Sequence, residues 1–183
     1  MNYDNNLDIN QRFSQNIKSY NQRIKNKNDK AMMIITLSIL EDILERLLKF
    51  KLSQVSQKAQ LPEMTYSSKV DLCYKMELIK SGLRRTLQIF DELSESFIKS
   101  TDEDYYGNLA IQTNIIELCK INENDIFNLI LALVNSAENM ETKYEKIEDL
   151  VSDVGWSGAL RFICAIISAS LAEALVDLNN KKQ

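Results

Sequence analysis

Glycine and proline are nearly absent from this chain, and their scarcity constrains the fold more than any other sequence feature. The 183 residues include four glycines and one proline. A fold made of many short strands needs many tight turns, which these two residues form most easily. We therefore predict an all-α fold, a single-domain bundle of six to seven helices. The length suffices for one hydrophobic core, and neither an internal repeat nor an interdomain linker is visible.

The first 28 residues carry one apolar stripe at helical spacing. Its members are Ile9, Phe13, Ile17, Tyr20 and Ile24. Steps of three and four residues place them on one face of a helix, which we expect to pack on the rest of the protein. Asparagine is frequent here and is a weak helix former, so a mobile arm is the alternative. We divide the chain into an N-terminal amphipathic helix or arm, 1–28, and an all-helical domain, 29–183.

The middle of the chain is expected to form four helices separated by polar segments. Asp29 is a candidate cap for a helix over about 30–51, whose first half is apolar nearly all round and should be buried. The segment 53–64 holds the only proline and is expected to be a loop. The further helices are predicted at 67–80, with Gly82 ending it, at 83–99, and at 109–121 after a turn.

The clearest periodicity in the chain is a heptad repeat in its last third. One set of positions is Ile130, Ala137, Tyr144 and Val151, and the other is Leu133, Met140, Ile147 and Val154. This pattern predicts one long heptad-patterned helix over 124–154, about 45 Å long at about 1.5 Å per residue. The glycines at 155 and 158 should end it. A last helix is predicted over 159–178, with small residues that allow close approach of a neighbouring helix.

Several short motifs occur between residues 29 and 100. Asp29-Lys-Ala31 precedes a leucine helix with glutamates at 40–48. Ser68-Lys-Val-Asp-Leu-Cys-Tyr and Glu77-Leu-Ile-Lys-Ser-Gly-Leu-Arg-Arg-x-Leu87 follow. Together they resemble the mannitol-operon repressor (MltR-like) family. The resemblance implies an all-α fold and a role as a transcriptional regulator.

The MltR-like helix ends in Arg-Asn-x-Phe-Ala-His, which is similar to the Arg-x4-His element of the HEPN superfamily that includes ribonucleases. Ser94 and Lys99 stand at the arginine and histidine positions here. An arginine holds a phosphate and a histidine moves a proton near neutral pH. Serine carries no charge for a phosphate, and a lysine with a pKa of about 10.4 is a poor base at pH 7. We therefore expect this degenerate motif to be inactive as a nuclease.

The absence of histidine excludes most catalytic arrangements. Without it there is no Ser–His or Cys–His pair, and the commonest transition-metal ligand is missing. No Gly-rich nucleotide motif occurs either. The carboxylates at 41, 42 and 45 have no Glu-x-x-His partners, so we expect a solvent-facing helix turn. We predict no catalytic residue, no metal and no cofactor.

The three cysteines do not form a disulfide or zinc framework. They are Cys73, Cys119 and Cys164. Their number is odd, no CxxC motif occurs, and each lies within an apolar helical pattern. We expect buried free thiols.

Charge is distributed unevenly along the chain. The net charge of −4 argues against a nucleic-acid partner, because phosphate contacts need a basic face. The one compact basic cluster beyond the first 30 residues is Lys80, Arg84 and Arg85, and its helix becomes acidic further on. Residues 101–155 hold 12 acidic and 3 basic side chains. This half of the chain could bind a basic partner, and a solvated helix face is the alternative.

A row of carboxylates within that acidic region is the candidate interaction surface. The candidate partner-binding residues are Glu138, Glu141, Glu145, Glu148, Asp149 and Asp153. Like charges three or four residues apart cost a helix a few tenths of a kcal/mol per pair. A row maintained at that cost indicates a basic partner, although a solvated face explains it equally well.

These observations lead to one expected function and one alternative. We predict a non-catalytic protein-binding regulator or inhibitor, most concretely an immunity protein or antitoxin that neutralises a basic toxin through the acidic helix face. The alternative is an MltR-like transcriptional repressor. The most apolar stretch, 162–172, is too short to span a bilayer, and no secretory signal is visible, so we expect a cytoplasmic protein without membrane contact. The heptad seam packs either within the chain or in a homodimer.

Overall fold

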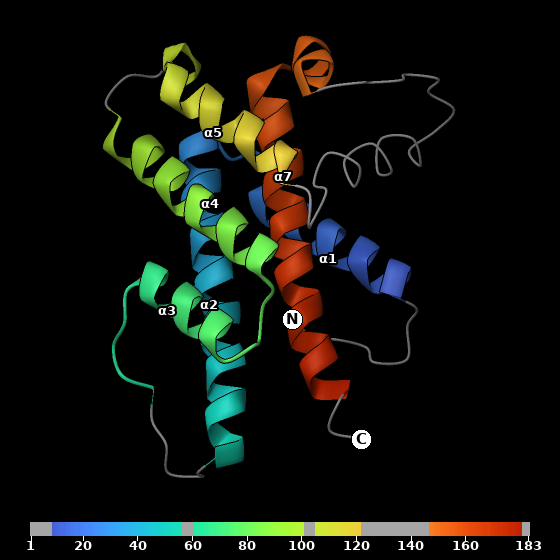
Figure 1. Ribbon diagram of the computed structural model, residues 1–183. Coiled ribbons are helices and arrows are strands. Elements are labelled where there is room, and N and C mark those ends of the chain that lie inside the picture. The colour runs from blue at the N-terminus through green and yellow to red at the C-terminus, as the bar shows by residue number, and fades with distance from the viewer. Residues whose placement is uncertain (1–8, 56–60, 101–104, 122–146, 181–183) are drawn as a thin grey trace.

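The computed structural model describes residues 9–55, 61–100, 105–121 and 147–180, and it confirms the all-α fold (Figure 1). Its elements are α1 (Ile9–Ile24), α2 (Asp29–Val55), α3 (Tyr66–Lys75), α4 (Ser81–Lys99), the 3₁₀ turn η1 (Tyr105–Gly107), α5 (Leu109–Lys120) and α7 (Ile147–Asn180). Within these ranges there are six α-helices and no strand. They form one bundle around a common hydrophobic core.

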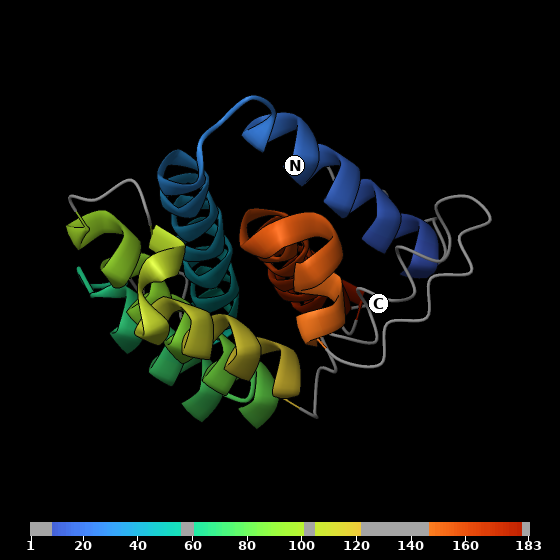
Figure 2. The same cartoon turned by 90° about the horizontal axis from the view of Figure 1, so that it is seen from above.

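Helix α7 is the centre of the bundle. It packs against α1 and α2, and also contacts α5 and α4. Seen from above, α1 lies on one side of α7, while α4 and α5 lie on the other (Figure 2). Nearly every side chain from Ala159 to Val176 is buried, as expected for a helix that is apolar on all faces. The alanines at 165, 169 and 172 are at most 2% exposed, so small residues do face closely packed neighbours, as predicted.

The same helix is long and apolar enough, over Ile147–Leu178, to cross a bilayer. The stretch predicted from sequence, 162–172, was shorter because it stopped at the nearest charged residues. Most of the apolar part of α7 is buried among the other helices. Its composition is therefore accounted for by its place in the core.

Helix α1 lies on α7 and α2, and the described side chains of its apolar stripe, from Phe13 onward, are turned inward. Ile17, Tyr20 and Ile24 are buried in the common core. The Tyr20 hydroxyl lies 2.6 Å from Thr36 Oγ1, and Thr36 in turn donates to the carbonyl of Met32. Both buried hydroxyls are thereby hydrogen-bonded, which avoids the cost of burying an unpaired polar group.

The predicted cap of α2 is wrong by one residue. Asn28 Oδ1 accepts a hydrogen bond from the amide of Ala31 at 2.8 Å, the contact that an N-cap side chain makes. Asp29 is consequently the first residue of the helix. Its carboxylate is not used for capping and bonds to other elements instead.

The predicted stop at Gly82 is also wrong. The chain reverses earlier, at Glu77, which has a φ of 58°. Leu78 donates its amide hydrogen to the carbonyl of Cys73 at 2.9 Å, and Glu77 donates its amide hydrogen to the carbonyl of Tyr74 at 3.0 Å. These two bonds define a Schellman motif, which usually has glycine at the left-handed position. Gly82 is instead buried in the first turn of α4.

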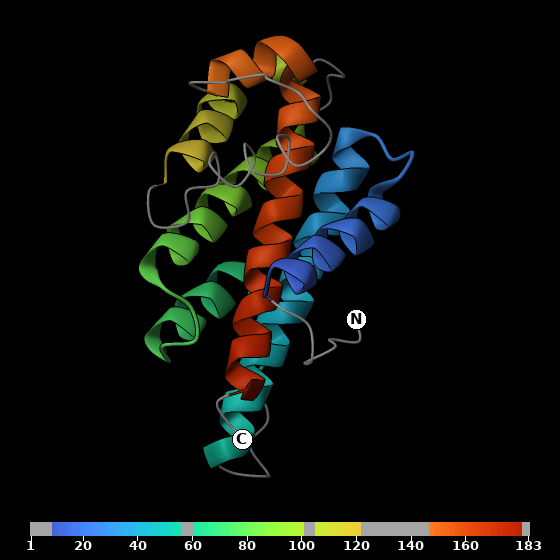
Figure 3. The same ribbon diagram turned by 90° about the vertical axis from the view of Figure 1, so that its right-hand side faces the viewer.

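Gly155 interrupts the last helix as predicted, but α7 continues directly beyond it. Its backbone, with φ 73° and ψ 168°, lies in a region that residues with a Cβ avoid. Figure 3 shows the first turns of α7 set at a sharp angle to the rest. A Cβ added to Gly158 would lie 2.9 Å from the Cβ of Val154, so the chain is also crowded just after the kink. Of the predicted 124–154 heptad helix, residues 124–146 lie outside the described residues.

Candidate functional site

The candidate acidic residues fall partly within the structure. Glu148, Asp149 and Asp153 lie in the first turns of α7, whereas Glu138, Glu141 and Glu145 lie outside the described residues. Glu148 and Asp153 are exposed and Asp149 is half-buried. On the inward side, Ile147 and Leu150 are buried. This segment therefore presents carboxylates outward and apolar side chains inward.

The acidic segment itself contains no basic side chain, although Lys146 precedes it and Arg161 follows it in sequence. No lysine or arginine occurs from residue 147 to residue 160. Val154, the residue before the kink, is 38% exposed beside these carboxylates. Burial raises the pKa of the Cys119 thiol to about 12, and the negative charge of Glu148 adds to the effect. That influence places Glu148 close to the end of α5.

A partly buried carboxylate, that of Asp29, holds α7 in place immediately after the kink. Asp29 Oδ2 accepts a hydrogen bond from the hydroxyl of Tyr106 at 2.6 Å. Its Oδ1 accepts from the hydroxyl of Ser157 at 2.8 Å and from the guanidinium of Arg161 at 3.0 Å. The Asp29 side chain is 13% exposed. We call these four residues the Asp29 junction.

The Asp29 junction joins three elements, α2, η1 and α7, and it also fixes the turn before α2. Arg161 donates a second hydrogen bond to the carbonyl of Lys27 at 2.7 Å. Burial, together with the hydrogen bond to Asp29 and its charge, raises the pKa of Tyr106 above its ordinary value, so this hydroxyl remains a donor. The residues just after the kink are thus fixed to α2, and this fixes the angle between the acidic first turns of α7 and the rest of the helix.

The carboxylates at 41 and 45 do not form the solvent-facing turn that we expected. The Lys69 ammonium lies 2.6 Å from Glu41 and 2.7 Å from Glu45, and the lysine is 5% exposed. Asp42 is turned outward, 3.8 Å from Arg46. Among the described residues, no cluster of three or more acidic, cysteine or histidine side chains is placed to hold a metal.

Burial alone would lower the pKa of Lys69, but the hydrogen bonds to its two carboxylate partners raise it. The same bond from Lys69, with a further one from Lys49, lowers the pKa of Glu45. Lys69 and Glu45 are therefore charged near neutral pH, and the two ion pairs of Lys69 tie α3 to α2. Lys69, Glu41 and Glu45 form a structural ion cluster rather than a proton-transfer site.

The two positions of the degenerate Arg-x4-His motif lie apart. Ser94 is completely buried, and its hydroxyl donates to the carbonyl of Asp91 at 2.8 Å. Lys99 is exposed and pairs with Glu95 at 2.5 Å. Burial and the nearby acidic side chains, Glu95 foremost, raise the pKa of Asp91.

The predicted basic cluster is largely occupied by internal contacts. Arg84 pairs with Asp71 at 2.9 Å and stacks 4.8 Å from the centre of the Tyr74 ring. Arg85 pairs with Glu117 at 2.6 Å. Lys80 instead lines a groove. Each of these three residues thus has a different set of neighbours.

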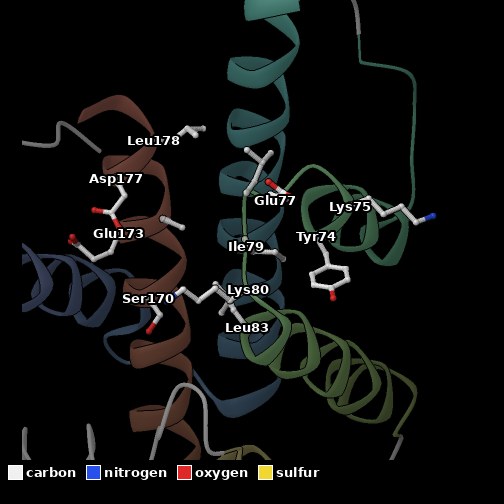
Figure 4. A pocket seen from close by; sticks show the side chains of 12 residues that line it. Tyr74, Lys75, Glu77, Ile79, Lys80, Leu83, Ser170, Glu173, Asp177 and Leu178 are labelled. Atoms are coloured by element: carbon white, nitrogen blue, oxygen red, sulfur yellow. The ribbon is translucent and has the colours of Figure 1, made fainter. Parts of the chain in front are cut away.

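That groove lies between the α3–α4 turn and the last turns of α7, with a volume of about 680 Å³ (Figure 4). Charged side chains from the α3–α4 side, Lys75, Glu77 and Lys80, line it together with carboxylates and apolar side chains of α7. Glu173, on the α7 wall, accepts bonds from Arg12 at 3.3 Å and Asn16 at 3.2 Å. Burial raises its pKa despite the neighbouring arginine. The side chain therefore anchors α1 to α7 rather than serving the groove.

The prediction that the cysteines are buried free thiols is confirmed. Burial raises the pKa of each thiol to about 12, so all three stay protonated at neutral pH. Cys73 donates weakly to the carbonyl of Leu44, at 3.8 Å. These thiols behave as small apolar side chains.

Sequence reasoning missed the polar side chains that join distant helices. Asp29 was interpreted as a cap, and neither Lys69 nor Glu173 was singled out. Only Glu173 carried a signal, because it is the one charged residue between Arg161 and Asp177. A lone charge in an otherwise apolar helix needs a buried partner.

Comparison of this chain with known protein families, with curated proteins and with solved structures finds no match.

Proposed function

We propose that this protein is a non-catalytic regulator or inhibitor that acts by binding another protein. Its most concrete form is an immunity protein or antitoxin that covers a basic toxin. The observation that carries the proposal is the acidic start of α7, which leaves the bundle at a sharp angle and is held from behind by the Asp29 junction.

The described part of this surface has the composition of a binding site for a basic partner. Glu148 and Asp153 are exposed beside Val154, an exposed apolar side chain. An apolar contact surrounded by polar groups is typical of protein interfaces. Carboxylates of one sign attract a basic protein at long range and also mimic the phosphates to which a basic nuclease binds.

The chemistry of the remaining side chains favours binding over catalysis. The thiols are buried with raised pKa values, and Ser94 is buried with its hydroxyl bonded to the backbone. Lys99 pairs with Glu95 on the surface. A nucleophile needs an adjacent base, and the described residues do not offer that combination.

The decisive test is a pull-down of the tagged protein from its source cell at 150 mM salt, about where surface charges are screened beyond 8 Å, with mass spectrometry of the bound material. We expect one stoichiometric basic protein that is released at high salt. Recovery of nothing beyond the protein itself would contradict the proposal.

A matched pair of variants localises the surface. Glu148→Lys with Asp153→Lys should abolish recovery of that protein, because it reverses both exposed charges of the acidic segment. Glu63→Lys with Glu92→Lys changes the net charge equally at exposed positions elsewhere, and it should leave recovery unchanged. Equal loss in both would show that only the overall charge matters.

The second candidate is an MltR-like transcriptional repressor, and the motifs between Ser68 and Leu87 favour it. Such a protein needs a basic surface on DNA. Arg84 and Arg85 are engaged in internal ion pairs, which weakens the cluster expected to supply it. Steeply salt-dependent, sequence-selective DNA binding would support this candidate, and no retention on heparin at low salt would contradict it.

A further inference from the structure

Charge in this protein is segregated in space, and the segregation is strongest at α1. Residues 9–28 contain five basic side chains and no acidic one, although the whole chain has a net charge of −4. The basic residues are Arg12, Lys18, Arg23, Lys25 and Lys27. Arg12 is turned inward to Glu173, so it serves the contact between α1 and α7. The other four are exposed, and we call them the basic face.

The four cations of the basic face are not engaged in ion pairs with the described part of the chain. The nearest acid in sequence, Asp29, is turned into the bundle, where both carboxylate oxygens are occupied by Tyr106, Ser157 and Arg161. It therefore does little to neutralise the lysines before it. The positive charge is left facing solvent.

The turn that carries part of the basic face is held firmly. Asn26 has a φ of 61°, and the amide of Lys27 bonds to the carbonyl of Ile24 at 3.0 Å. The carbonyl of Lys27 accepts from Arg161. Lys25 and Lys27 are thus presented from a fixed backbone, which reduces the entropy lost on binding.

The chemistry around these cations distinguishes between anionic partners. The apolar face of α1 is buried in the core through Ile17, Tyr20 and Ile24, so it is not available to enter a lipid layer. The exposed face carries amides among the cations, at Gln15 and Gln22. Cations mixed with amide donors suit phosphate and sugar oxygens.

We propose that the basic face of α1 and the α1–α2 turn binds the phosphodiester backbone of nucleic acid, without sequence preference. This surface lies on the opposite side of α7 from α4 and α5 (Figure 2). It is separate from Lys80, Arg84 and Arg85, and it does not depend on either function proposed above. The overall negative charge lowers the affinity but does not remove the local attraction.

Fluorescence polarisation of a labelled 20-base-pair DNA duplex and of a labelled single-stranded RNA, titrated with the full chain, tests the proposal. We expect binding of at least one of them. Four phosphate contacts would give a slope of log K against log salt of about −3.6 on duplex DNA. Binding of neither, or binding only to anionic phospholipid vesicles, would overturn the proposal.

Two matched triple variants distinguish the effect of the basic face on nucleic-acid affinity from the effect of the protein's net charge. Arg23→Gln/Lys25→Gln/Lys27→Gln should weaken binding roughly a hundredfold at low salt and reduce the slope by about 2.7. Lys75→Gln/Lys80→Gln/Lys120→Gln removes the same charge from exposed positions elsewhere and should weaken binding no more than about threefold. All six positions are exposed, so circular dichroism should show unchanged melting temperatures. Equal weakening by both variants would overturn the proposal.

Discussion

Three of the described residues have a positive φ, namely Asn26, Glu77 and Gly155. The α3–α4 turn and the kink in α7 meet this backbone requirement with different residue types. The kink in α7 has glycine at position 155, with φ 73°. The α3–α4 turn has Glu77, with φ 58°. Glycine adopts such angles without steric cost, whereas a residue with a Cβ loses about 1–2 kcal/mol. The difference shows that glycine content alone does not locate the chain reversals of this fold.

The two places also differ in how they are anchored. Shortly after the kink, Ser157 and Arg161 bond to the partly buried carboxylate of Asp29. The turn is preceded by α3, which Lys69 ties to the carboxylates of α2. One anchor is a carboxylate with three donors from other elements, and the other is an ammonium with two acceptors on a single helix. Substitutions at the anchors and at the two left-handed residues test whether this comparison holds.

The largest effect should come from the anchor of the kink. We expect Asp29→Ala to lower the free energy of unfolding by about 2–3 kcal/mol, because it removes three charge-assisted hydrogen bonds from partly buried donors. Urea denaturation followed by circular dichroism measures it. Asp42→Ala, an exposed acid on the same helix, should change the value by less than about 0.5 kcal/mol. Equal effects would mean that the Asp29 junction contributes no special stability.

Gly155→Ala should have the next largest effect. Nothing lies within 4 Å of a Cβ added there, so the cost comes from the backbone alone. For this region of φ and ψ we expect a loss of about 2 kcal/mol, measured by the same denaturation. Ser152→Ala, at an exposed helical position nearby, is the control and should be nearly neutral. A neutral Gly155→Ala would show that the kink relaxes without cost.

Lys69→Met should lower the free energy of unfolding at pH 7 by about 1–2 kcal/mol. The cost stays below that of a fully buried pair, because Glu41 and Glu45 are partly exposed and can regain water. Lys69 lowers the folded-state pKa of Glu45, so this contribution is present above the unfolded pKa of glutamate, about 4.3, and is lost as the pH falls through the folded value. The gap in melting temperature between wild type and variant should therefore narrow from pH 7 to pH 3. A constant gap would contradict the ion-pair account.

The smallest effect should be a gain in stability. We expect Glu77→Gly to raise the free energy of unfolding by about 0.5–1 kcal/mol, because the left-handed angle no longer opposes a Cβ. Denaturant unfolding measures it. Lys75→Gly, within the last turn of α3, should instead cost about 1 kcal/mol. A loss with Glu77→Gly would mean that its side chain makes a contact that outweighs the strain.

The helices themselves were predictable because apolar periodicity is a local property. Ile17, Tyr20 and Ile24 of the α1 stripe are buried, as the spacing predicted. The end of α3 was not predictable from turn residues. Leu78 and Ile79 are 8% and 6% exposed, so the chain has to reverse before them to place both in the core. Tertiary packing therefore places the reversal at Glu77. Gly82, five residues later, lies buried in the first turn of α4 instead.

The candidate site was predictable only in part, for a related reason. Spacing along one helix identified the carboxylates at 148, 149 and 153. In the Asp29 junction, by contrast, the partners lie 77 to 132 positions from Asp29 in sequence. A local sequence pattern cannot predict contacts at that separation. Aspartate is also a common N-cap residue, so the sequence favoured a capping role for Asp29 over the interhelical hydrogen bonds that it makes.

The central place of α7 has a consequence for how the protein is made. Helices α1, α2, α4 and α5 all pack against α7, yet α7 follows them all in the chain. During synthesis the earlier helices therefore leave the ribosome before the surface that covers their apolar faces exists. The core can close only when α7 emerges, and the contacts it then makes span long sequence separations, which slows folding. Until that moment the nascent chain depends on solubility from its charged faces, and the basic face of α1 is the first of these to emerge among the described residues.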